Sequence, residues 1–436
     1  MTALRHLFAA TLALIIAADA SAASLMIHNV HLVDGRSPTP TPGKTVLIEG
    51  DRIRLVTDSS EGVSANRTID ANGGYLIPGL WDMHVHVQHI EPESLAQFVH
   101  YGVTQVRDMG ITPEALAAID SQNSLSRPEI FSAGFMLNSA RWSQLFSQVY
   151  GPGEIQQEMQ RRIVVGSSGQ ATSAVERVRD SGAAVVKVHF WHDQPELFQA
   201  IAAQADRVGL PIAAHDPGPA FDYDQLAAVG VDSLEHLDGM LAHRLSRLSA
   251  AQRGRQYRVL ADAGVHFTPT LSMIDGLSRL ADGTDPDSRL EPLRSHPDGL
   301  PLDRSLDTFW ASVMKMIPPE APDWSTFQRD LQFLIEARTH GVRILAGTDL
   351  GVPGVYPGIS LIEELELLVQ HLGMTPHEAI TAATLVPAEW FGIEDILGTI
   401  EPGKRANLVL LKDDPTASID ALDAIVHVIL DGAIAR

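Results

Sequence analysis

Two histidines separated by a single residue are the first side chains in the sequence that could do chemistry. His84 and His86 close the apolar run YLIPGLWDMHVH. On a β-strand, residues at this spacing point to the same side, so the pair could bind one metal ion. The pair alone is weak evidence, because the chain has 18 histidines and some share this spacing by chance. The chain has no cysteine, so a transition-metal site must use His, Asp, Glu or Lys.

Four further polar side chains stand in, or at the end of, other apolar runs. They are Lys187 in AAVVKVHF, His215 in LPIAAHD, His236 in VDSLEH and Asp349 in VRILAGTD. Taken singly, each histidine could be a hydrogen-bonded core residue, and the aspartate could cap the following helix. Separate structural roles do not account for their shared position in strand-like runs. We therefore expect these four residues and the histidine pair to form one metal site.

Lys187 is the most informative member of this set. An ammonium group inside an apolar strand loses its hydration, which is costly unless the group changes its charge. A neutral lysine can react with carbon dioxide, and the resulting carbamate has two oxygens that can bridge two cations. The alternative is a charged lysine that reaches the rim of the fold or pairs with a carboxylate such as Asp108 or Asp349.

A pair of divalent cations in such a site would keep a net positive charge. The carbamate, the Asp349 carboxylate and a bridging hydroxide cancel only part of the cationic charge, and the imidazoles are neutral. This centre would polarise a carbonyl or phosphoryl oxygen and stabilise the oxyanion that forms after attack. Asp349 then has a catalytic task as well, because it can move a proton from the water to the leaving nitrogen or oxygen. The chemistry is metal-assisted hydrolysis.

The elements that must position these residues follow from the pattern of apolar runs. Between residues 76 and 397, strand-like runs alternate with helix-like ones, which predicts an α/β fold with a (β/α)8 barrel. Short β-like runs at residues 23–75 and 398–436 predict that the two terminal regions pair into one small satellite domain. Two longer stretches, 138–162 and 273–324, follow predicted strands. We interpret them as walls or lids of the site, with ordinary surface excursions as the alternative.

The composition and the first residues restrict the possible partners and the location of the protein. The formal net charge is −22, which disfavours nucleic acid and anionic membrane surfaces as partners. Residues 1–22 combine an early arginine, a short apolar stretch and the small residues of a cleavage site, which predicts a signal peptide. The alternative, a membrane anchor, would need about 20 apolar residues. We expect a secreted protein, periplasmic in a Gram-negative host, without a membrane association after cleavage.

Several strings together carry a family resemblance. PGLWDMHVH, VVKVH, AAH, SLEH, AGTD and the tail GTIEPGKRANLVLL resemble the amidohydrolase superfamily, closest to the imidazolonepropionase-like group with metal-dependent dipeptidases, of the prolidase and Xaa-Arg type, and amidases. The resemblance implies a deformed (β/α)8 barrel with a small β-sandwich formed from both terminal regions. It also implies that His84, His86 and Asp349 hold one metal ion, that His215 and His236 hold a second, and that a carbamylated Lys187 bridges them, usually over zinc.

The predicted function is that of a secreted binuclear amidohydrolase that cleaves dipeptides or N-acyl amino acids. Hydrolysis of a cyclic amide, a lactone or another ester on the same centre is the alternative among enzymes. Deaminases of the superfamily generally use one metal without a bridging lysine, so Lys187 counts against them. A non-catalytic periplasmic binding protein is the alternative outside enzymes. The predicted substrate contacts are Tyr223, His192, Asn138 and Arg107. The sequence leaves a homo-oligomer open.

Overall fold

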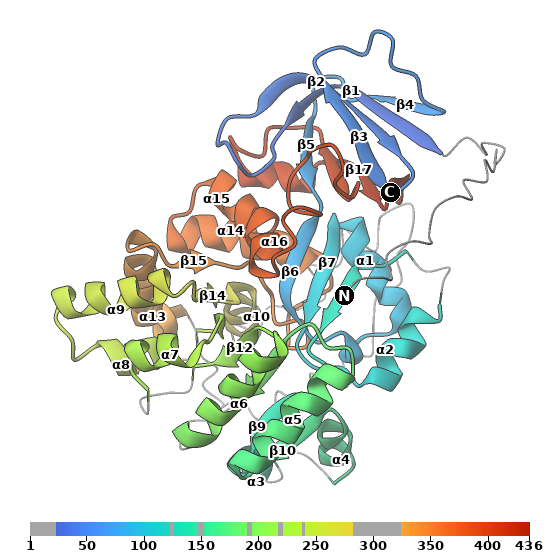
Figure 1. The fold of residues 1–436 in the computed structure, drawn as a ribbon. Helices are drawn as coiled ribbons and strands as arrows, with labels where there is room; N and C mark the ends of the chain where they lie inside the picture. Colours follow the sequence, from blue (N-terminus) through green and yellow to red (C-terminus); the bar gives the residue numbers. More distant parts are fainter. Residues whose placement is uncertain are drawn as a thin grey trace, which may run out of the picture.

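The computed structural model describes most of the chain (Figure 1). The described residues are 23–122, 126–146, 152–189, 194–216, 221–237, 240–281 and 324–436. The predicted signal peptide and most of the stretch 273–324 lie outside these ranges. Within them, no helix is both long enough and apolar enough to cross a membrane.

Both terminal regions contribute to one mixed sheet, which Figure 1 shows at the top of the molecule in blue and red. Its strands are β1 (Ser24–Leu32), β2 (Thr41–Glu49), β3 (Arg52–Thr57), β4 (Arg67–Asp70), β5 (Tyr75–Pro78), β16 (Leu408–Leu411), β17 (Ile425–Leu430) and β18 (Ala433–Ile434). The order is β18-β17-β16-β5-β1-β2-β3, with β4 beside β1. Its own aliphatic core includes Ile27, Val46 and Leu408. The sheet extends to Pro78, slightly past the predicted boundary.

The middle of the chain forms a ring of parallel strands. They are β6 (Leu80–Val85), β7 (Val103–Asp108), β8 (Glu129–Ser132), β11 (Val186–His189), β12 (Ile212–His215), β13 (Ser233–Glu235), β14 (His266–Thr268) and β15 (Arg343–Ile344). The ladder β6-β7-β8 meets the longer ladder through a hydrogen bond from Ala184 N to Ser132 O, 2.8 Å long. On the other side, Met83 N donates to Ala346 O over 2.9 Å. The predicted fold class, a deformed barrel with a small domain, is confirmed.

Helices surround this ring (Figure 1). They are α1 (Leu95–His100), α2 (Pro113–Asp120), α5 (Ser168–Asp180), α6 (Pro195–Val208), α7 (Tyr223–Val229), α8 (Met240–Leu245), α9 (Ala250–Asp262), α10 (Leu271–Ala281), α13 (Trp324–Thr339), α14 (Ile359–Leu372), α15 (Pro376–Ala382) and α16 (Leu385–Trp390). Side-chain caps fix where several begin: Asp222, Ser249 and Thr375 each form a capping box. Their apolar faces pack on the outer side of the strands in one large core.

The first long stretch after a predicted strand folds into regular elements. β9 (Met136–Ser139), α3 (Ala140–Phe146), α4 (Pro152–Gln160) and β10 (Arg162–Val165) follow one another there. β9 pairs with β11 in parallel, and β10 pairs with β9, so both strands extend the ladder beyond the ring. This addition brings side chains of β10 next to the carboxyl ends of the barrel strands.

One glycine joins the terminal sheet to the barrel. β5 passes directly into β6 at Gly79, and a Cβ atom there would lie 2.0 Å from Thr104 Oγ1 on β7. Only glycine allows this close passage. The junction therefore fixes where β6 begins, and with it the positions of His84 and His86 near its end.

Candidate metal centre

The carboxyl ends of β6 and β15 bring three predicted ligands together. His84 Nε2 lies 3.6 Å and His86 Nε2 3.4 Å from the same carboxylate oxygen, Oδ1 of Asp349. One nitrogen or oxygen of each residue lies within 4.8 Å of those of the other two. His84, on β6, and His86, one residue past its end, both face the interior of the ring. This arrangement could hold a metal ion.

The second predicted pair of histidines lies next to the first group. His236 Nδ1 is 3.7 Å from Oδ2 of Asp349 and 3.0 Å from the hydroxyl oxygen of Thr270. The ring of His236 lies 4.4 Å from that of His84 and 4.5 Å from that of His215, measured between centroids. The five predicted imidazole and carboxylate ligands therefore line one interior space.

The backbone is strained at two of these residues. Asp349 has a φ of 61° and His236 a φ of 71°, both in the left-handed region that side chains rarely adopt. Such conformations cost about 1–3 kcal/mol each and persist where surrounding structure enforces them, often at functional sites. At Gly347, a Cβ atom would lie 2.8 Å from His84 N, so the chain before Asp349 passes very close to β6.

Lys187 is buried in β11, with 1% of its surface exposed. Its Nζ atom has no hydrogen-bond partner among the described residues. Burial lowers its pKa to about 8, while the nearby carboxylates of Glu235 and Asp349 act in the opposite direction. Near neutral pH the neutral amine, which is the form that can react with carbon dioxide, is therefore far more populated than in an ordinary lysine.

The imidazoles around it are neutral. Burial lowers the pKa of His84, His86 and His215 well below the ordinary histidine value, and the charge of Lys187 lowers it further. Burial also lowers the pKa of His236 to about 3. Neutral imidazole is the form that binds metal ions.

The buried donor atoms of this cluster suit a metal ion. His84 Nε2, like Lys187 Nζ, is buried without a hydrogen-bond partner in the described part of the chain. A buried polar atom of this kind usually has a partner, and one without it calls for an explanation such as an ion. Imidazole nitrogens with one carboxylate are suitable ligands for zinc and similar divalent cations.

Arg107 lies behind His84, on the far side of Glu235. It is fully buried on β7, and its Nη2 donates to both carboxylate oxygens of Glu235 over 2.8 and 3.0 Å. Its Nε donates to Met83 O over 2.6 Å. Glu235 Oε2 in turn lies 2.7 Å from His84 Nδ1. These contacts give Arg107 protein partners, and its assignment as a substrate contact stays a prediction. Glu235 is a residue that sequence reasoning missed.

Asn138 supports another histidine that the sequence analysis missed. Its Nδ2 lies 3.0 Å from His189 Nδ1, and its Oδ1 accepts from Arg162 Nη1 over 3.2 Å. Asn138 is fully buried and positioned to orient His189, and its assignment as a substrate contact stays a prediction. The His189 ring lies 4.1 Å from that of His215 between centroids. The signal was present, because His189 stands two residues after Lys187 on the same strand face.

The two remaining predicted contacts are Tyr223 and His192, and His192 lies outside the described residues. Tyr223 is fully buried at the start of α7, with the guanidinium of Arg244 4.8 Å above its ring. Its hydroxyl has no hydrogen-bond partner among the residues that the structure describes. Arg244 also forms an ion pair with Asp216, the residue after His215. The assignment of Tyr223 as a substrate contact stays a prediction.

A cationic group borders the metal centre on the side of β10. Arg161 and Arg162 share one carboxylate, that of Glu158, at 2.6 and 3.0 Å. Arg161 Nη2 also lies 3.2 Å from Nε2 of His89, whose ring is 6.1 Å from that of His86 between centroids. Two guanidinium groups with one carboxylate carry a net positive charge, which favours anionic groups nearby.

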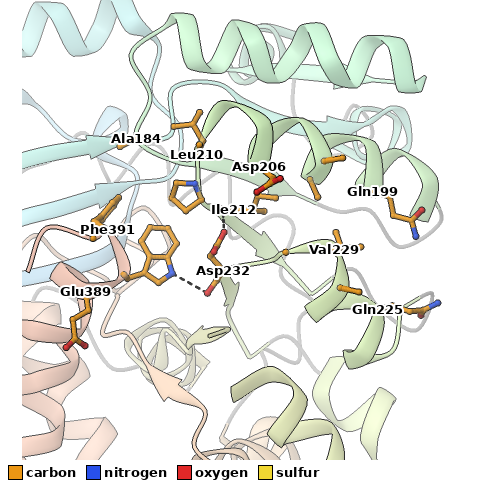
Figure 2. A pocket seen from close by; sticks show the side chains of 18 residues that line it. Ala184, Gln199, Asp206, Leu210, Ile212, Gln225, Val229, Asp232, Glu389 and Phe391 are labelled. Atoms are coloured by element: carbon orange, nitrogen blue, oxygen red, sulfur yellow. Dashed lines mark hydrogen bonds between the residues drawn. The ribbon is translucent and has the colours of Figure 1, made fainter. Parts of the chain in front are cut away.

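A groove of about 1150 Å³ lies at the opposite ends of the strands (Figure 2). It is bordered by Ile212, where β12 begins, and by Asp232, just before β13. The Trp390 indole donates to Asp232 O over 3.2 Å, and Asp232 Oδ2 accepts from Ile212 N over 2.6 Å. Because His215 ends the strand that Ile212 starts, this groove is separate from the metal centre.

Comparison with known proteins identifies the family of this chain. The model of the amidohydrolase family matches residues 75–435. The adenine deaminase of Rubrobacter xylanophilus is 25% identical over 404 residues, which cover 90% of this chain and 54% of that protein, so the chain spans about half the length of this relative. The imidazolonepropionase of Pseudomonas putida is 25% identical over 361 residues, covering 80% and 81% of the two chains.

A solved structure supports the fold over nearly the whole chain. The structure of a Xaa-Pro dipeptidase with bound methionine matches with a TM-score of 0.68 and 22% identity, and the match covers 94% of this chain and 99% of that chain. Because the family model extends over most of the sequence, the protein belongs to the amidohydrolase family.

Proposed function

We propose that the protein is a binuclear metal-dependent hydrolase that cleaves the amide bond of dipeptides or N-acyl amino acids. The observation that carries this proposal is the cluster of His84, His86 and Asp349 beside the buried, unpartnered Lys187. A cluster of neutral imidazoles and one carboxylate has no evident structural use at the end of a barrel, whereas it suits a divalent cation.

The chain offers ligands for two ions. His84, His86 and Asp349 would hold one, His215 and His236 the other, and Lys187 as a carbamate would bridge them. To form the carbamate, the neutral lysine nitrogen adds to the carbon of carbon dioxide and loses one proton. Bound divalent cations, most simply zinc, lower the pKa of water and polarise the amide carbonyl.

Asp349 is the residue suited to moving the proton. Its carboxylate lies 3.4–3.7 Å from nitrogens of three histidines, so it borders the space where water and substrate would meet. Burial raises its pKa, although His236 and Lys187 act in the opposite direction. In the proposed reaction it accepts a proton from the attacking water and gives it to the leaving nitrogen.

His189 supplies a hydrogen-bond donor at the edge of this space. Because Asn138 Nδ2 and Arg162 Nη1 both approach its Nδ1 as donors, at 3.0 and 3.4 Å, that nitrogen is the acceptor. The ring therefore carries its proton on Nε2. This donor and the net positive charge of β10 suit the free carboxylate of a dipeptide or an N-acyl amino acid.

The carboxylate distinguishes the proposed substrates from the alternatives. A cyclic amide or a lactone without a carboxylate would make no use of the net positive charge that Arg161, Arg162 and Glu158 place beside this space. The similarity to an adenine deaminase raises deamination as another reaction. Lys187 argues against it, because deaminases of the superfamily generally lack a bridging lysine. Secretion through residues 1–22 belongs to the same proposal.

The test begins with metal content and continues with a substrate screen. Purified protein is expected to hold about two zinc ions and to release amino acids from a library of dipeptides and N-acyl amino acids. Chelation should abolish the hydrolysis, and added zinc should restore it. Protein that binds such ligands equally well without metal and never cleaves them would instead be a binding protein.

The same screen should include adenine, cyclic amides and lactones. Turnover of one of these, with none on carboxylate-bearing amides, would contradict the proposed substrate class while keeping the metal chemistry.

A further inference from the structure

We propose that Glu235, held by Arg107, is a positioning residue that fixes His84 as a metal ligand. The inference rests on the metal centre of the proposed function and adds the device that orients one ligand. It concerns Nδ1 of His84, the ring nitrogen that faces away from Asp349, and the buried ion pair of Glu235 and Arg107 next to it.

The contacts define which nitrogen of His84 carries the proton. Glu235 accepts from Arg107 Nη2 with both oxygens and from the Ser233 hydroxyl over 2.5 Å. A carboxylate that already accepts from these donors is an acceptor toward His84 as well. The Nδ1 atom of His84, 2.7 Å away, therefore donates, and Nε2 is left with a free lone pair directed toward Asp349.

Arg107 keeps the carboxylate in place from across the barrel. Its guanidinium spans from β7 to Ser233 and Glu235 on β13, with Nη1 3.0 Å from the Ser233 hydroxyl. Its Nη2 also donates to Thr268 Oγ1 on β14 over 3.2 Å. Trp390 stacks beneath it, with the guanidinium carbon 4.6 Å from the ring centroid. Glu235 thus has few alternative conformations.

Packing alone does not account for this pair. Both side chains are fully buried, and apolar residues of similar size often replace a buried ion pair without loss of stability. A carboxylate behind a metal-binding imidazole, by contrast, fixes its tautomer and raises its basicity. The other histidine of β6 lacks this support, because His86 Nδ1 has no hydrogen-bond partner among the residues that the structure describes. We infer that His84 is the anchored ligand of the two.

The test measures Zn²⁺ affinity of metal-free protein by competition with a chromophoric chelator. Glu235→Gln keeps the side-chain volume and one acceptor oxygen but removes the negative charge. It therefore also removes the ion-pair partner of Arg107. The double variant Arg107→Met with Glu235→Leu removes both charges together. A loss of about 10- to 100-fold in Zn²⁺ affinity is expected in both variants.

The double variant separates positioning from simple charge neutralisation. If Glu235 only balanced Arg107, the double variant would bind Zn²⁺ as tightly as the wild type, and that result would overturn the inference. Glu336→Gln is the matched control, because it breaks another bidentate pair, with Arg253 at 2.7 and 3.0 Å, between α9 and α13. Its Zn²⁺ affinity should equal that of the wild type.

A spectroscopic measurement on the wild type covers the case in which the variants do not fold. In ¹⁵N spectra of the metal-free protein, His84 should be protonated at Nδ1 with a strongly hydrogen-bonded proton. Protonation at Nε2 would overturn the inference. Wild-type protein that takes up no Zn²⁺ would overturn the proposed function, whereas normal uptake with an unaffected double variant would overturn only the role of Glu235.

Discussion

The two ends of the barrel strands use their polar side chains in different ways. At the carboxyl ends, His84 and Lys187 are buried with polar atoms that have no partner among the described residues. At the amino ends, Asp232 accepts from the Ile212 amide, and Trp390 donates to Asp232 O. One end thus keeps ligand atoms available, and the other uses polar atoms to satisfy the backbone. The difference shows which end is organised for binding and which for stability.

The largest expected effect is at the end with available ligand atoms. Lys187→Ala should abolish turnover and lower the zinc content, because the proposed bridge between two ions would be lost. A short carboxylic acid such as propionate should restore part of the activity by occupying the space of the carbamate. Activity assays and metal analysis check both points, and a fully active alanine variant would contradict the bridge.

The next effect concerns proton transfer. Asp349→Asn should keep the fold, because asparagine tolerates the left-handed backbone at this position. It should lower kcat by a factor of about 10² or more, since the amide cannot move the proton. Circular dichroism and steady-state kinetics on the same preparation measure both quantities. An unchanged kcat would exclude Asp349 as the proton carrier.

A smaller effect tests how closely the segment around Gly347 passes β6 and β14 at the metal centre. Gly347→Ala would place a Cβ atom 2.7 Å from Thr268 Cγ2 and 2.8 Å from His84 N. We expect a loss of about 1–3 kcal/mol in unfolding free energy, together with weaker Zn²⁺ binding. Chemical denaturation and Zn²⁺ titration measure the two changes.

Gly169→Ala in α5 is the control for this substitution, because a Cβ atom there meets nothing within 4 Å. It should leave Zn²⁺ binding unchanged and raise stability by up to about 1 kcal/mol, as alanine favours helices. Equal Zn²⁺ affinities in the two alanine variants would contradict the importance of the close approach.

The smallest effect on the metal centre is expected from the opposite end of the barrel, where the change is one of stability and depends on pH. Burial lowers the pKa of His266, at the start of β14, to about 4. The unfolded chain takes up this proton below pH of about 6.5, whereas the folded chain does so only near pH 4. This residue therefore makes the folded state less stable as pH falls through that window, by at most about 1.4 kcal/mol per pH unit.

His266→Gln should reduce this acid sensitivity without changing Zn²⁺ affinity at neutral pH. Chelator-treated protein is the right sample, because metal release in acid would otherwise contribute. Unfolding curves at several pH values between 4 and 7 give the slope, and identical slopes for wild type and variant would refute the assignment.

The sequence predicted the parts of this molecule that follow local rules. Alternation along a strand placed His84 and His86 on one side, and the ends of apolar runs located His215, His236 and Asp349. The parallel barrel follows from the same alternation of strand-like and helix-like runs. The roles of these residues as ligands stay predictions, but the structure brings them to one place.

Other residues could not be placed, because their environment depends on contacts across the barrel. Arg107 and Asn138 look like exposed polar residues near strand ends, yet each is fully buried. Arg107 meets Glu235 from the opposite side of the ring, and Asn138 meets Arg162 from an added strand. A linear pattern gives the side of a strand that a residue faces, but not its depth or its partner.

The pairing of β5 has a consequence for how the protein is made. β5 lies between β1 and β16, and β16 is separated from β5 in the sequence by the whole barrel. During translation, the hydrogen-bonding edge of β5 therefore stays uncovered until the barrel and β16 have left the ribosome. Since β5 runs directly into β6, which leads to His84 and His86, the nascent chain completes this support only after the barrel has been synthesised. A chain that stops before Leu408 would therefore leave the backbone edge of β5 unpaired and able to pair with other chains. The strand that leads into β6 would then lack its second neighbour.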